Sequence, residues 1–383
     1  MKVCYLVRSM DQGGAQNQLL ETVKHLDKAR FDISVLTFYA GGQYWAEINR
    51  LEGVSVSSLS KSGRWDLVGF LSRLRDKLQQ IQPEVLHSYI GTTNIFSVFM
   101  KLFFPKMKVV WAIRNSKPEI PGFDLPGQGV VFLERRVARF VDLIIANSNA
   151  GKQYYSQMGF PENKITVIPN GIDTERYRPD EEARIRVRSE WGVAPGEKVI
   201  GVVGRIAPIK DLPNFFKAAV LLLQKRQDVR FVVIGDGPSQ YRDLLGKMTK
   251  ELGIYSRIIW AGLRNDMEKV YNGLDIFTST SLYGEGFSNA IAEAMSCDIS
   301  CVVTDVGDSA LIVKGIGKVV PPGDSMALVN AWQKTFEESA IASRQLMGRK
   351  RIQGDYSLLQ MAERTGNSIQ GLISKAEGFA GIQ

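Results

Sequence analysis

Two glutamates that lie eight positions apart, Glu285 and Glu293, are the side chains best suited to hold a polyhydroxylated ligand. Glu285 precedes the start of an expected helix and Glu293 lies inside it. Gly286 and Phe287 would present backbone N–H groups to an anion at that start, and Ser288 follows them as a further binding candidate. A carboxylate can accept hydrogen bonds from two neighbouring hydroxyls. Helix capping would explain Glu285 but not Glu293, so we interpret the pair as one carboxylate for a sugar and one for a ribose.

Two cations stand close together in the sequence before another expected helix. Gly204-Arg205 ends an apolar strand, and Lys210 follows five residues after Arg205. Arg can bond a phosphate in a fork while Lys acts as a point charge, so the pair favours a diphosphate. Both cations would also stabilise charge on a departing diphosphate, which makes Arg205, Lys210 and Glu285 the catalytic candidates. The alternative is that they are solvated charges at a helix start.

A glycine turn follows the first strand. Gly13-Gly14-Ala15 opens a helix expected from Gln16 to Leu26, and Gly14 would let a ligand approach the helix N-terminus. A tight structural turn explains the same residues equally well. The GxGxxG pattern and the P-loop lysine are missing here, which argues against a dinucleotide oxidoreductase and a P-loop NTPase.

Short runs rich in Val and Ile alternate with amphipathic, helix-length stretches. Runs of this kind are apolar on both faces and predict parallel sheets covered by helices on each side. The pattern occurs twice, which predicts an α/β protein with two Rossmann-like, doubly wound domains. The expected strands are 3–7, 33–36, 54–56, 85–87, 109–113, 143–146 and 166–168, followed by 199–203, 229–234, 258–260, 276–278, 300–303 and one that ends at Val320.

The join between the domains is expected at Ile168-Pro169-Asn170-Gly171-Ile172-Asp173, because a proline and an Asn-Gly turn close the first series. We therefore predict one domain over residues 1–170 and a second over 171–360. Asp324 is expected to cap a helix, and the chain after residue 340 is expected to be helical.

Charge is distributed unevenly along the chain. The net charge is +8, and residues 1–170 hold 21 lysines and arginines against 14 aspartates and glutamates. The first half thus suits an anionic surface or acceptor, although a merely soluble surface fits equally well. Nucleic acid is disfavoured, because no base-reading module accompanies the basic residues.

Few side chains favour a metal or redox site. Cys4, Cys297 and Cys301 are sparse, and we expect the last two to pack as small apolar residues rather than form a metal or redox pair. No signal peptide or membrane-spanning helix is expected, which favours the cytoplasm.

These motifs together resemble the retaining glycosyltransferases of family 4, which have the GT-B architecture of two Rossmann-like domains and an interdomain cleft. The resemblance covers nearly the whole chain. Within the family, these motifs resemble most the branch that builds bacterial surface polysaccharides. The segments that carry it are Gly-Gly-Ala at 13–15, the linker at 168–173, Gly204-Arg205 with Lys210, the run Ile-Gly-Asp-Gly-Pro at 234–238, and the E-x7-E pair Glu285 and Glu293.

The resemblance implies roles for individual residues. A nucleotide-diphosphate sugar, expected to be a UDP-sugar, would bind mainly to the second domain. Arg205 and Lys210 would hold the diphosphate, Glu285 the sugar and Glu293 the ribose. The base would lie near Leu263 and Arg264.

It also implies features of the reaction and of the chain's end. No metal would be obligatory, and the acceptor would attack the face from which the leaving group departs, with the donor phosphate helping to take its proton. The acceptor would be a glycan or a polyprenyl-diphosphate-linked sugar. Residues 361–383 would form a helix that crosses back to the first domain.

Three positions differ from the family pattern. Arg114-Asn115 stands where many relatives have a histidine, and Gln16 stands where glutamate is common. His87 keeps only part of a Val-His-Ser-His pattern. Arg114, Asn115 and His87 are therefore the candidates for the acceptor side, with a satisfied core histidine as the alternative for His87.

A surface for membrane contact is a further hypothesis. An anionic membrane could meet, on its cytoplasmic face, a set of apolar and basic side chains: Phe96, Phe99, Met100, Phe103 and Phe104, followed by Lys106 and Lys108. Helical spacing favours core packing for this set.

Two alternative functions remain. The chain could be a sugar-nucleotide epimerase of the same architecture or a non-catalytic sugar-nucleotide-binding protein.

Overall fold

The computed structural model describes residues 1–383 except 12, 64, 115–124, 339–344 and 381–383. The chain divides into two compact units. Unit 1 contains Met1–Gly171 together with the segment from Leu358 to the end of the chain, and unit 2 contains Ile172–Ser357. For comparison, the sequence placed the first boundary after residue 170 and the second after residue 360.

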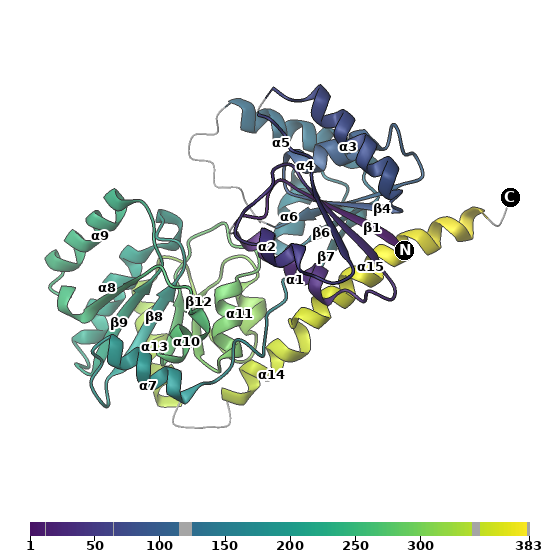
Figure 1. The fold of residues 1–383 in the computed structure, drawn as a ribbon. Helices are drawn as coiled ribbons and strands as arrows, with labels where there is room; N and C mark the ends of the chain where they lie inside the picture. Colours follow the sequence, from purple (N-terminus) through teal and green to yellow (C-terminus); the bar gives the residue numbers. More distant parts are fainter. Residues whose placement is uncertain (12, 64, 115–124, 339–344, 381–383) are drawn as a thin grey trace. The chain divides into compact units, whose positions relative to one another are not determined.

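Unit 1 contains a seven-stranded parallel sheet in the order β3-β2-β1-β4-β5-β6-β7 (Figure 1). Its strands are β1 Lys2–Val7, β2 Asp32–Thr37, β3 Val54–Ser58, β4 Val85–Tyr89, β5 Lys108–Ile113, β6 Leu143–Ala146 and β7 Ile165–Val167. Its helices are α1 Gly14–His25, α2 Trp45–Asn49, α3 Val68–Ile81, α4 Thr92–Met100, α5 Leu125–Val137, α6 Asn149–Gln157 and α15 Leu358–Ala380, with 3-10 turns η1 Ala138–Phe140 and η2 Glu162–Lys164.

Unit 2 contains a six-stranded parallel sheet in the order β10-β9-β8-β11-β12-β13. Its strands are β8 Lys198–Val203, β9 Val229–Ile234, β10 Ile258–Gly262, β11 Ile276–Ser279, β12 Ser300–Thr304 and β13 Lys318–Val320. Its helices are α7 Glu181–Glu190, α8 Leu212–Leu223, α9 Ser239–Glu251, α10 Met267–Asn272, α11 Asn289–Ser296, α12 Ser309–Val313, α13 Ser325–Glu338 and α14 Gln345–Asp355, with 3-10 turns η3 Pro208–Lys210 and η4 Tyr255–Arg257.

Each sheet is buried on both faces, as its Val- and Ile-rich strands predict. Along β1, Val3 and Tyr5 belong to one core cluster while Cys4 and Leu6 belong to another, so alternate residues enter opposite cores. Unit 2 repeats this division in its own two clusters. The predicted fold class is therefore confirmed.

The strand order reverses at one place in each sheet. In unit 1 the chain moves outward from β1 to β3 and then returns to pair β4 with the other side of β1. In unit 2, β11 pairs with β8 in the same way. In parallel sheets, ligands bind beyond the carboxyl ends of the strands at such a reversal.

The last helix, α15, belongs to unit 1 and packs on α1. Met361 and Ile369 are buried in the unit 1 core. Close to them, the Gln18 amide both donates to the Gly171 carbonyl oxygen and accepts from the Gly171 N–H, at 3.1 and 3.0 Å. The end of the first chain segment is thus tied to α1.

Two smaller predictions can also be compared with the fold. Asp324 accepts a hydrogen bond from the Ala327 N–H at 2.8 Å, so it caps the start of α13 as expected. Cys297 and Cys301 are buried, free thiols, which agrees with their expected packing role. Across the described residues, we find no helix with the length and apolar character needed to span a bilayer.

Candidate functional site

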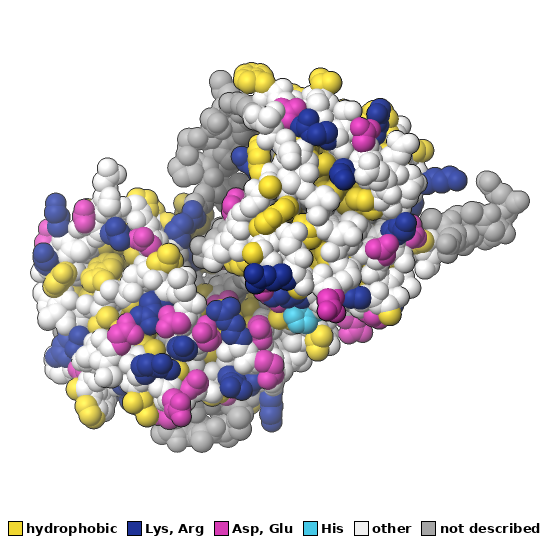
Figure 2. Space-filling model, in the orientation of Figure 1, with side chains coloured by type: hydrophobic (Ala, Val, Ile, Leu, Met, Phe, Trp, Pro, Cys, Tyr) yellow, Lys and Arg dark blue, Asp and Glu magenta, His cyan; other side chains and the backbone are white. Residues whose placement is uncertain are grey.

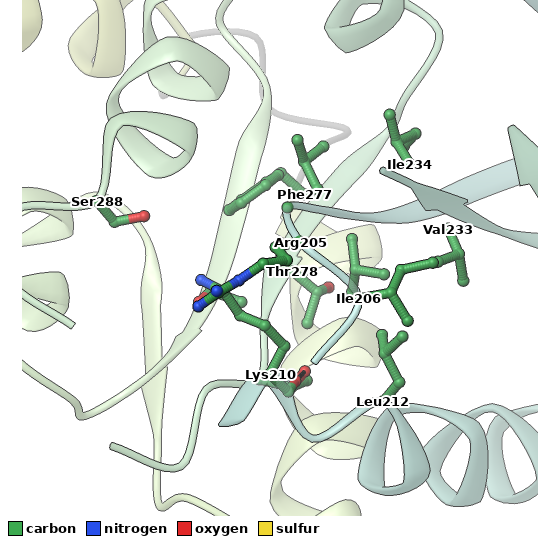
Figure 3. Close-up of a pocket in the computed structure, with 14 residues that line it drawn as sticks. Arg205, Ile206, Lys210, Leu212, Val233, Ile234, Phe277, Thr278 and Ser288 are labelled. Atoms are coloured by element: carbon green, nitrogen blue, oxygen red, sulfur yellow. Dashed lines mark hydrogen bonds between the residues drawn. The ribbon is translucent and has the colours of Figure 1, made fainter. Parts of the chain in front are cut away.

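The predicted diphosphate residues lie at the strand reversal of unit 2. Gly204 follows β8 in a left-handed region of backbone space (φ +145°), and Arg205 comes next. Lys210 ends the short turn η3 before α8. Figure 3 shows the side chains of Arg205 and Lys210 extending toward the same hollow, which is also lined by Thr278, Thr280 and Ser288. The structure thus brings the two cations together.

Glu285 joins them from the loop after β11. Its carboxylate forms an ion pair with the Lys210 ammonium group and accepts a hydrogen bond from Ser281 Oγ at 2.6 Å. The Thr280 hydroxyl donates to the Lys210 carbonyl oxygen at 2.5 Å, which fixes the backbone beside it. The three catalytic candidates predicted from the sequence therefore form one polar group in unit 2.

Two glycines allow the backbones of this site to approach closely. A Cβ on Gly235 (φ +135°) would lie 1.9 Å from the Gly204 carbonyl oxygen, and one on Gly307 (φ +61°) would lie 2.3 Å from that of Glu285. Real side chains never come this near to a backbone atom, so both positions need glycine. The loops that carry Arg205 and Glu285 are thus held by neighbouring loops without intervening side chains.

The start of α11 borders this hollow through Ser288. Ser288 is its N-cap residue and makes no side-chain capping bond. Phe287 turns its ring into the core, where it packs 5.2 Å from Tyr356, and the Gly286 carbonyl accepts from the Asp308 N–H at 3.2 Å. That the backbone N–H groups of Gly286 and Phe287 face an anion stays a prediction.

Glu293 lies one turn inside α11 and is partly buried. The Tyr271 hydroxyl donates to its Oε2 at 2.8 Å, and Tyr177 also bonds the carboxylate. Burial raises the pKa of Glu293, while these phenols and the Arg176 charge act in the opposite direction. The two glutamates thus have different surroundings: Glu285 contacts a cation and Glu293 contacts neutral hydroxyls.

Leu263 and Arg264 follow β10, two strands away from β8 in the sheet order. The Leu263 side chain is 67% exposed. Arg264 is fixed by Glu190 and Asp266, with two 2.8 Å bonds to the latter. Adjacent strands lie ~4.8 Å apart, so these residues stand ~10 Å from the end of β8.

Unit 1 has its own hollow at the reversal between β1 and β4, with a volume of about 420 Å³. Gly14 is the first residue of α1, and a Cβ there would meet nothing within 4 Å, so the helix start is open. Packing therefore does not require this glycine. The hollow's polar lining includes Arg8, Gln16, Tyr89, Asn94, Arg114 and Glu134.

Arg114 follows β5 and enters this hollow. Its guanidinium donates to Asn170 Oδ1 at 3.0 Å and to the Tyr89 hydroxyl at 3.1 Å, and it lies 5.2 Å from the centre of the Tyr89 ring. These contacts hold the Arg114 cation in the hollow, and its acceptor-side role stays a prediction. Asn115, the neighbouring candidate, lies outside the described residues.

His87 does not line the hollow. It is fully buried on β4 between the rings of Tyr5 and Tyr89, 5.1 and 4.9 Å away. Neither ring nitrogen has a hydrogen-bond partner in the described part of the chain. Burial and the nearby Arg114 charge lower the pKa of His87 to about 3. It is a neutral core histidine, although not the satisfied one that the alternative reading expected.

A buried carboxyl group that the sequence did not reveal lies in the same hollow. Glu134, on α5, accepts a hydrogen bond from the Asn94 amide at 3.0 Å and is 9% exposed. Burial raises the pKa of Glu134 to about 7. The sequence also missed Tyr271, Tyr177 and Asn94, because no motif or periodicity marks the side chains that they contact. Ser281, four residues before Glu285, could have been suspected from spacing. Across the described residues, we find no group of three or more His, Cys, Asp and Glu side chains suited to a metal ion.

Comparison with known proteins adds two family matches. Residues 12–176 match the model described as Glycosyltransferase Family 4, and residues 197–338 match the model described as Glycosyl transferases group 1. The first lies almost entirely in unit 1 and the second entirely in unit 2.

Individual relatives match over most of the chain. A UDP-Gal:alpha-D-GlcNAc-diphosphoundecaprenol alpha-1,3-galactosyltransferase of Escherichia coli is 26% identical over 92% of each chain. The lipopolysaccharide core biosynthesis mannosyltransferase LpsB of Rhizobium meliloti is 28% identical over 63% of this chain and 68% of its own. Among solved structures, Anabaena HepE in complex with UDP superimposes with a TM-score of 0.83 at 20% identity, covering 97% of this chain and 100% of HepE.

Proposed function

Because this chain belongs to the family 4 and group 1 glycosyltransferases, we propose that it transfers a sugar from a UDP-sugar to a lipid-linked glycan. The transfer would retain the configuration of the sugar's anomeric carbon and serve bacterial surface polysaccharide synthesis. This proposal goes beyond the family in naming the donor, the acceptor class and the stereochemistry.

The observation that carries it is the convergence of Arg205, Lys210 and Glu285 at the strand reversal of unit 2. Two cations beside each other repel, and a diphosphate would neutralise both. Lys210 is paired with Glu285 in this structure, so a diphosphate that reached Lys210 would release the Glu285 carboxylate to sugar hydroxyls. The same ion pair would thus couple phosphate binding to sugar binding.

The proposed chemistry balances without a protein nucleophile. The bond between the anomeric carbon and the donor's β-phosphate oxygen breaks, and the acceptor oxygen bonds that carbon on the same face. The acceptor's proton passes to the departing phosphate oxygen. Arg205 and Lys210 stabilise the charge that develops on the diphosphate, an effect typically worth a few kcal/mol, ~3 for one well-placed donor.

The nucleoside would extend along the sheet toward β10. Glu293 would meet the ribose, and the base would lie near Leu263 and Arg264, whose distance of ~10 Å from the end of β8 suits a nucleoside. Arg264 is already paired with Glu190 and Asp266, so it would frame the base rather than neutralise a phosphate.

The acceptor would enter the hollow of unit 1. The E. coli relative is named for a GlcNAc-diphosphoundecaprenol acceptor, and we propose the same class here. Arg114 would meet acceptor or sugar oxygens, while Glu134 and Asn94 offer a hydrogen-bonding pair deeper in the hollow.

A lipid-linked acceptor requires contact with a membrane, and unit 1 has a suitable surface. We call it the α4 surface and define it by Phe99, Leu102, Phe103, Phe140 and Arg75. The first four are 43–76% exposed, the Arg75 guanidinium lies 6.0 Å from the Phe103 ring, and Lys101 donates to the Phe140 carbonyl oxygen. Figure 2 shows hydrophobic and basic side chains interspersed over unit 1.

The sequence favoured core packing for this segment, but only some of its side chains are buried. Met100 is buried, and Phe96 and Phe104 pack against the core, but Phe99 and Phe103 do not. Exposed apolar rings beside basic groups favour an anionic bilayer surface. The enzyme would then act in the cytoplasm, at the inner face of the membrane.

The test is a transfer assay with the full-length chain. UDP-galactose, UDP-glucose and UDP-N-acetylglucosamine are each supplied with a prenyl-diphosphate-linked GlcNAc, in EDTA and then in magnesium. We expect one donor to yield UDP and an extended lipid-linked product in EDTA, with the donor's anomeric configuration retained by NMR.

Other outcomes would contradict the proposal in different ways. Isomerised donor without product would indicate the epimerase alternative, and donor binding without turnover would indicate the binding protein. An inverted anomeric centre would overturn retention alone, and activity that appears only with magnesium would overturn metal independence.

A further inference from the structure

Tyr271 and Tyr177 hold the carboxylate of Glu293 from two different segments of unit 2. Tyr271 lies on α10 and is fully buried, and its hydroxyl donates to Glu293 at 2.8 Å. Tyr177 lies in the segment before α7 and also bonds the carboxylate. The two rings meet edge to face at 6.0 Å, and Tyr271 also packs 6.2 Å from Phe277 on β11. The phenols are thus placed by aromatic packing.

The backbone of Tyr177 is fixed to the end of the helix that carries Glu293. Ser296 Oγ donates to the Tyr177 carbonyl oxygen, and Arg349 on α14 donates at 2.9 Å to the carbonyl oxygens of both Tyr177 and Ser296. Arg349 also reaches the Thr174 carbonyl at 2.8 Å. One arginine therefore joins this segment to α11, which keeps Tyr177 at a set distance from Glu293.

The number of hydrogen bonds available at Glu293 has a consequence. A carboxylate offers about four acceptor positions. Two phenol groups occupy two of them and leave two for a ligand. The Glu293 side chain is only partly buried, so the remaining positions can be reached from outside. Two vicinal hydroxyls need two acceptors on one carboxylate, which matches this remainder.

We propose that Tyr271 and Tyr177 are positioning residues that turn Glu293 toward the vicinal hydroxyls of the donor's ribose and thereby select ribonucleotides over deoxyribonucleotides. This inference rests on the proposed function, which assigns the ribose to Glu293. Without the phenols, the carboxylate could rotate and would lose hydrogen bonds that stabilise its charge in a partly buried site.

A tyrosine that only fills the core would behave differently. Replacing it by phenylalanine would change the stability of unit 2 and would weaken all nucleotides by the same factor. A positioning role predicts that the effect depends on whether the ligand has a 2′-hydroxyl. The ratio of two affinities therefore separates the roles, because a general loss of folded protein cancels in it.

The experiment measures the dissociation constants of UDP and 2′-deoxy-UDP by calorimetry on the full-length chain. Wild type is expected to prefer UDP by about tenfold, since a hydrogen bond to a charged group is worth about that factor. Tyr271→Phe and Tyr177→Phe should each reduce this preference by roughly threefold or more, with 2′-deoxy-UDP affinity changed by less than about twofold. Glu293→Gln should remove most of the preference, and adding Tyr271→Phe to it should change little further.

Tyr255→Phe is the matched control, because Tyr255 is exposed on η4 and contacts Lys250. It should leave both affinities unchanged. Equal weakening of both nucleotides by the two tyrosine variants, or an unchanged preference in them while Glu293→Gln loses it, would overturn the positioning role alone. If wild type binds neither nucleotide, the proposed UDP-sugar donor is wrong instead. Should Tyr271→Phe fail to fold, Tyr177→Phe carries the test, since Tyr177 is only partly buried.

Discussion

Units 1 and 2 have the same central strand order but arrange their polar groups differently at the strand reversal. In unit 2, Arg205, Lys210 and Glu285 lie on loops, and Lys210 and Glu285 neutralise each other. In unit 1, Arg8, Arg114 and the buried Glu134 line the hollow, and Glu134 accepts a hydrogen bond from the neutral Asn94 amide. Under the proposed function, the ion pair of unit 2 would suit a diphosphate, and the hollow of unit 1 would suit an acceptor that meets both neutral hydrogen-bonding groups and cations.

The pKa directions express the same contrast. In unit 1, burial lowers the pKa of His87 to about 3 and raises that of Glu134 to about 7, so both groups favour their neutral forms. The hollow also contains Arg8 and Arg114, so it combines a buried acid that favours its neutral form with two cations. Under the proposed function, one scaffold would supply a half-site for each substrate, and the side chains near the strand ends would decide which substrate each half-site takes.

Among the changes considered, removing the charge of Glu285 should have the largest effect on sugar transfer. Glu285→Gln should lower the turnover number by about 100- to 1000-fold, ~3–4 kcal/mol, because the sugar loses its carboxylate. UDP affinity should stay near the wild-type value, since Arg205 and Lys210 remain. Steady-state transfer assays and calorimetry measure the two quantities. Glu251→Gln, an exposed position on α9, is the control, and equal activity of Glu285→Gln and wild type would remove Glu285 from the mechanism.

Glu285, Arg205 and Lys210 could be expected to lie together because all three come in connections after strands of the same sheet. Each follows a strand whose Val- and Ile-rich run marks it, and parallel strands bring such loops to one edge. The strands were predicted for the same reason, mostly to within one or two residues. The contacts of Tyr271 with Glu293, on helices α10 and α11, and of Arg114 with Asn170 depend on the orientation of individual side chains. No periodicity encodes these contacts, because they depend on how whole helices and loops pack.

The buried carboxyl of unit 1 gives a pH-dependent prediction. Folded protein keeps the Glu134 proton up to about pH 7, whereas unfolded chain releases it near the usual 4.5. The folded state binds more protons in this window, so the free energy of unfolding falls as pH rises through it. Glu134→Gln cannot titrate, so it should gain roughly 3 kcal/mol relative to wild type between pH 4.5 and 8.

Hydrogen exchange against urea, followed on peptides from β4 and β5, measures this difference in unit 1. Comparing variant with wild type at each pH removes the contributions of other groups. Glu162→Gln is the control, because that carboxylate is 70% exposed. A difference that does not change with pH would show that Glu134 is already ionised in the folded state.

Arg205→Ala tests the proposed diphosphate site of unit 2, and its expected effect is smaller. UDP affinity should fall about 30-fold, ~2 kcal/mol, because a forked contact to the diphosphate is lost. UMP, which lacks the β-phosphate, should be affected less. Arg205→Lys should fall between the two, since it keeps the charge but not the fork. Calorimetry with UDP and UMP decides this, with Arg257→Ala on η4 as the control; equal losses for both nucleotides would place Arg205 away from the β-phosphate.

The smallest effect concerns the outer faces of the two units. The α4 surface of unit 1 combines exposed rings with basic groups, whereas exposed Ile185 and Leu244 of unit 2 are aliphatic and lie on separate helices, α7 and α9. Replacing both Leu102 and Phe103 by Glu should weaken binding to phosphatidylglycerol vesicles by about tenfold, ~1.4 kcal/mol, through lost apolar contact and added repulsion.

Vesicle sedimentation at moderate salt measures that change, and calorimetry should show unaltered UDP affinity, because the substitutions lie in unit 1. Replacing Ile185 and Leu244 by Glu adds the same charge to unit 2 and should have little effect on sedimentation. If both double variants lose binding equally, net charge rather than the α4 surface governs the attraction. If wild type does not bind the vesicles, a lipid-linked acceptor must reach unit 1 without help from this surface. The two units would then differ in function only through the side chains near their strand ends.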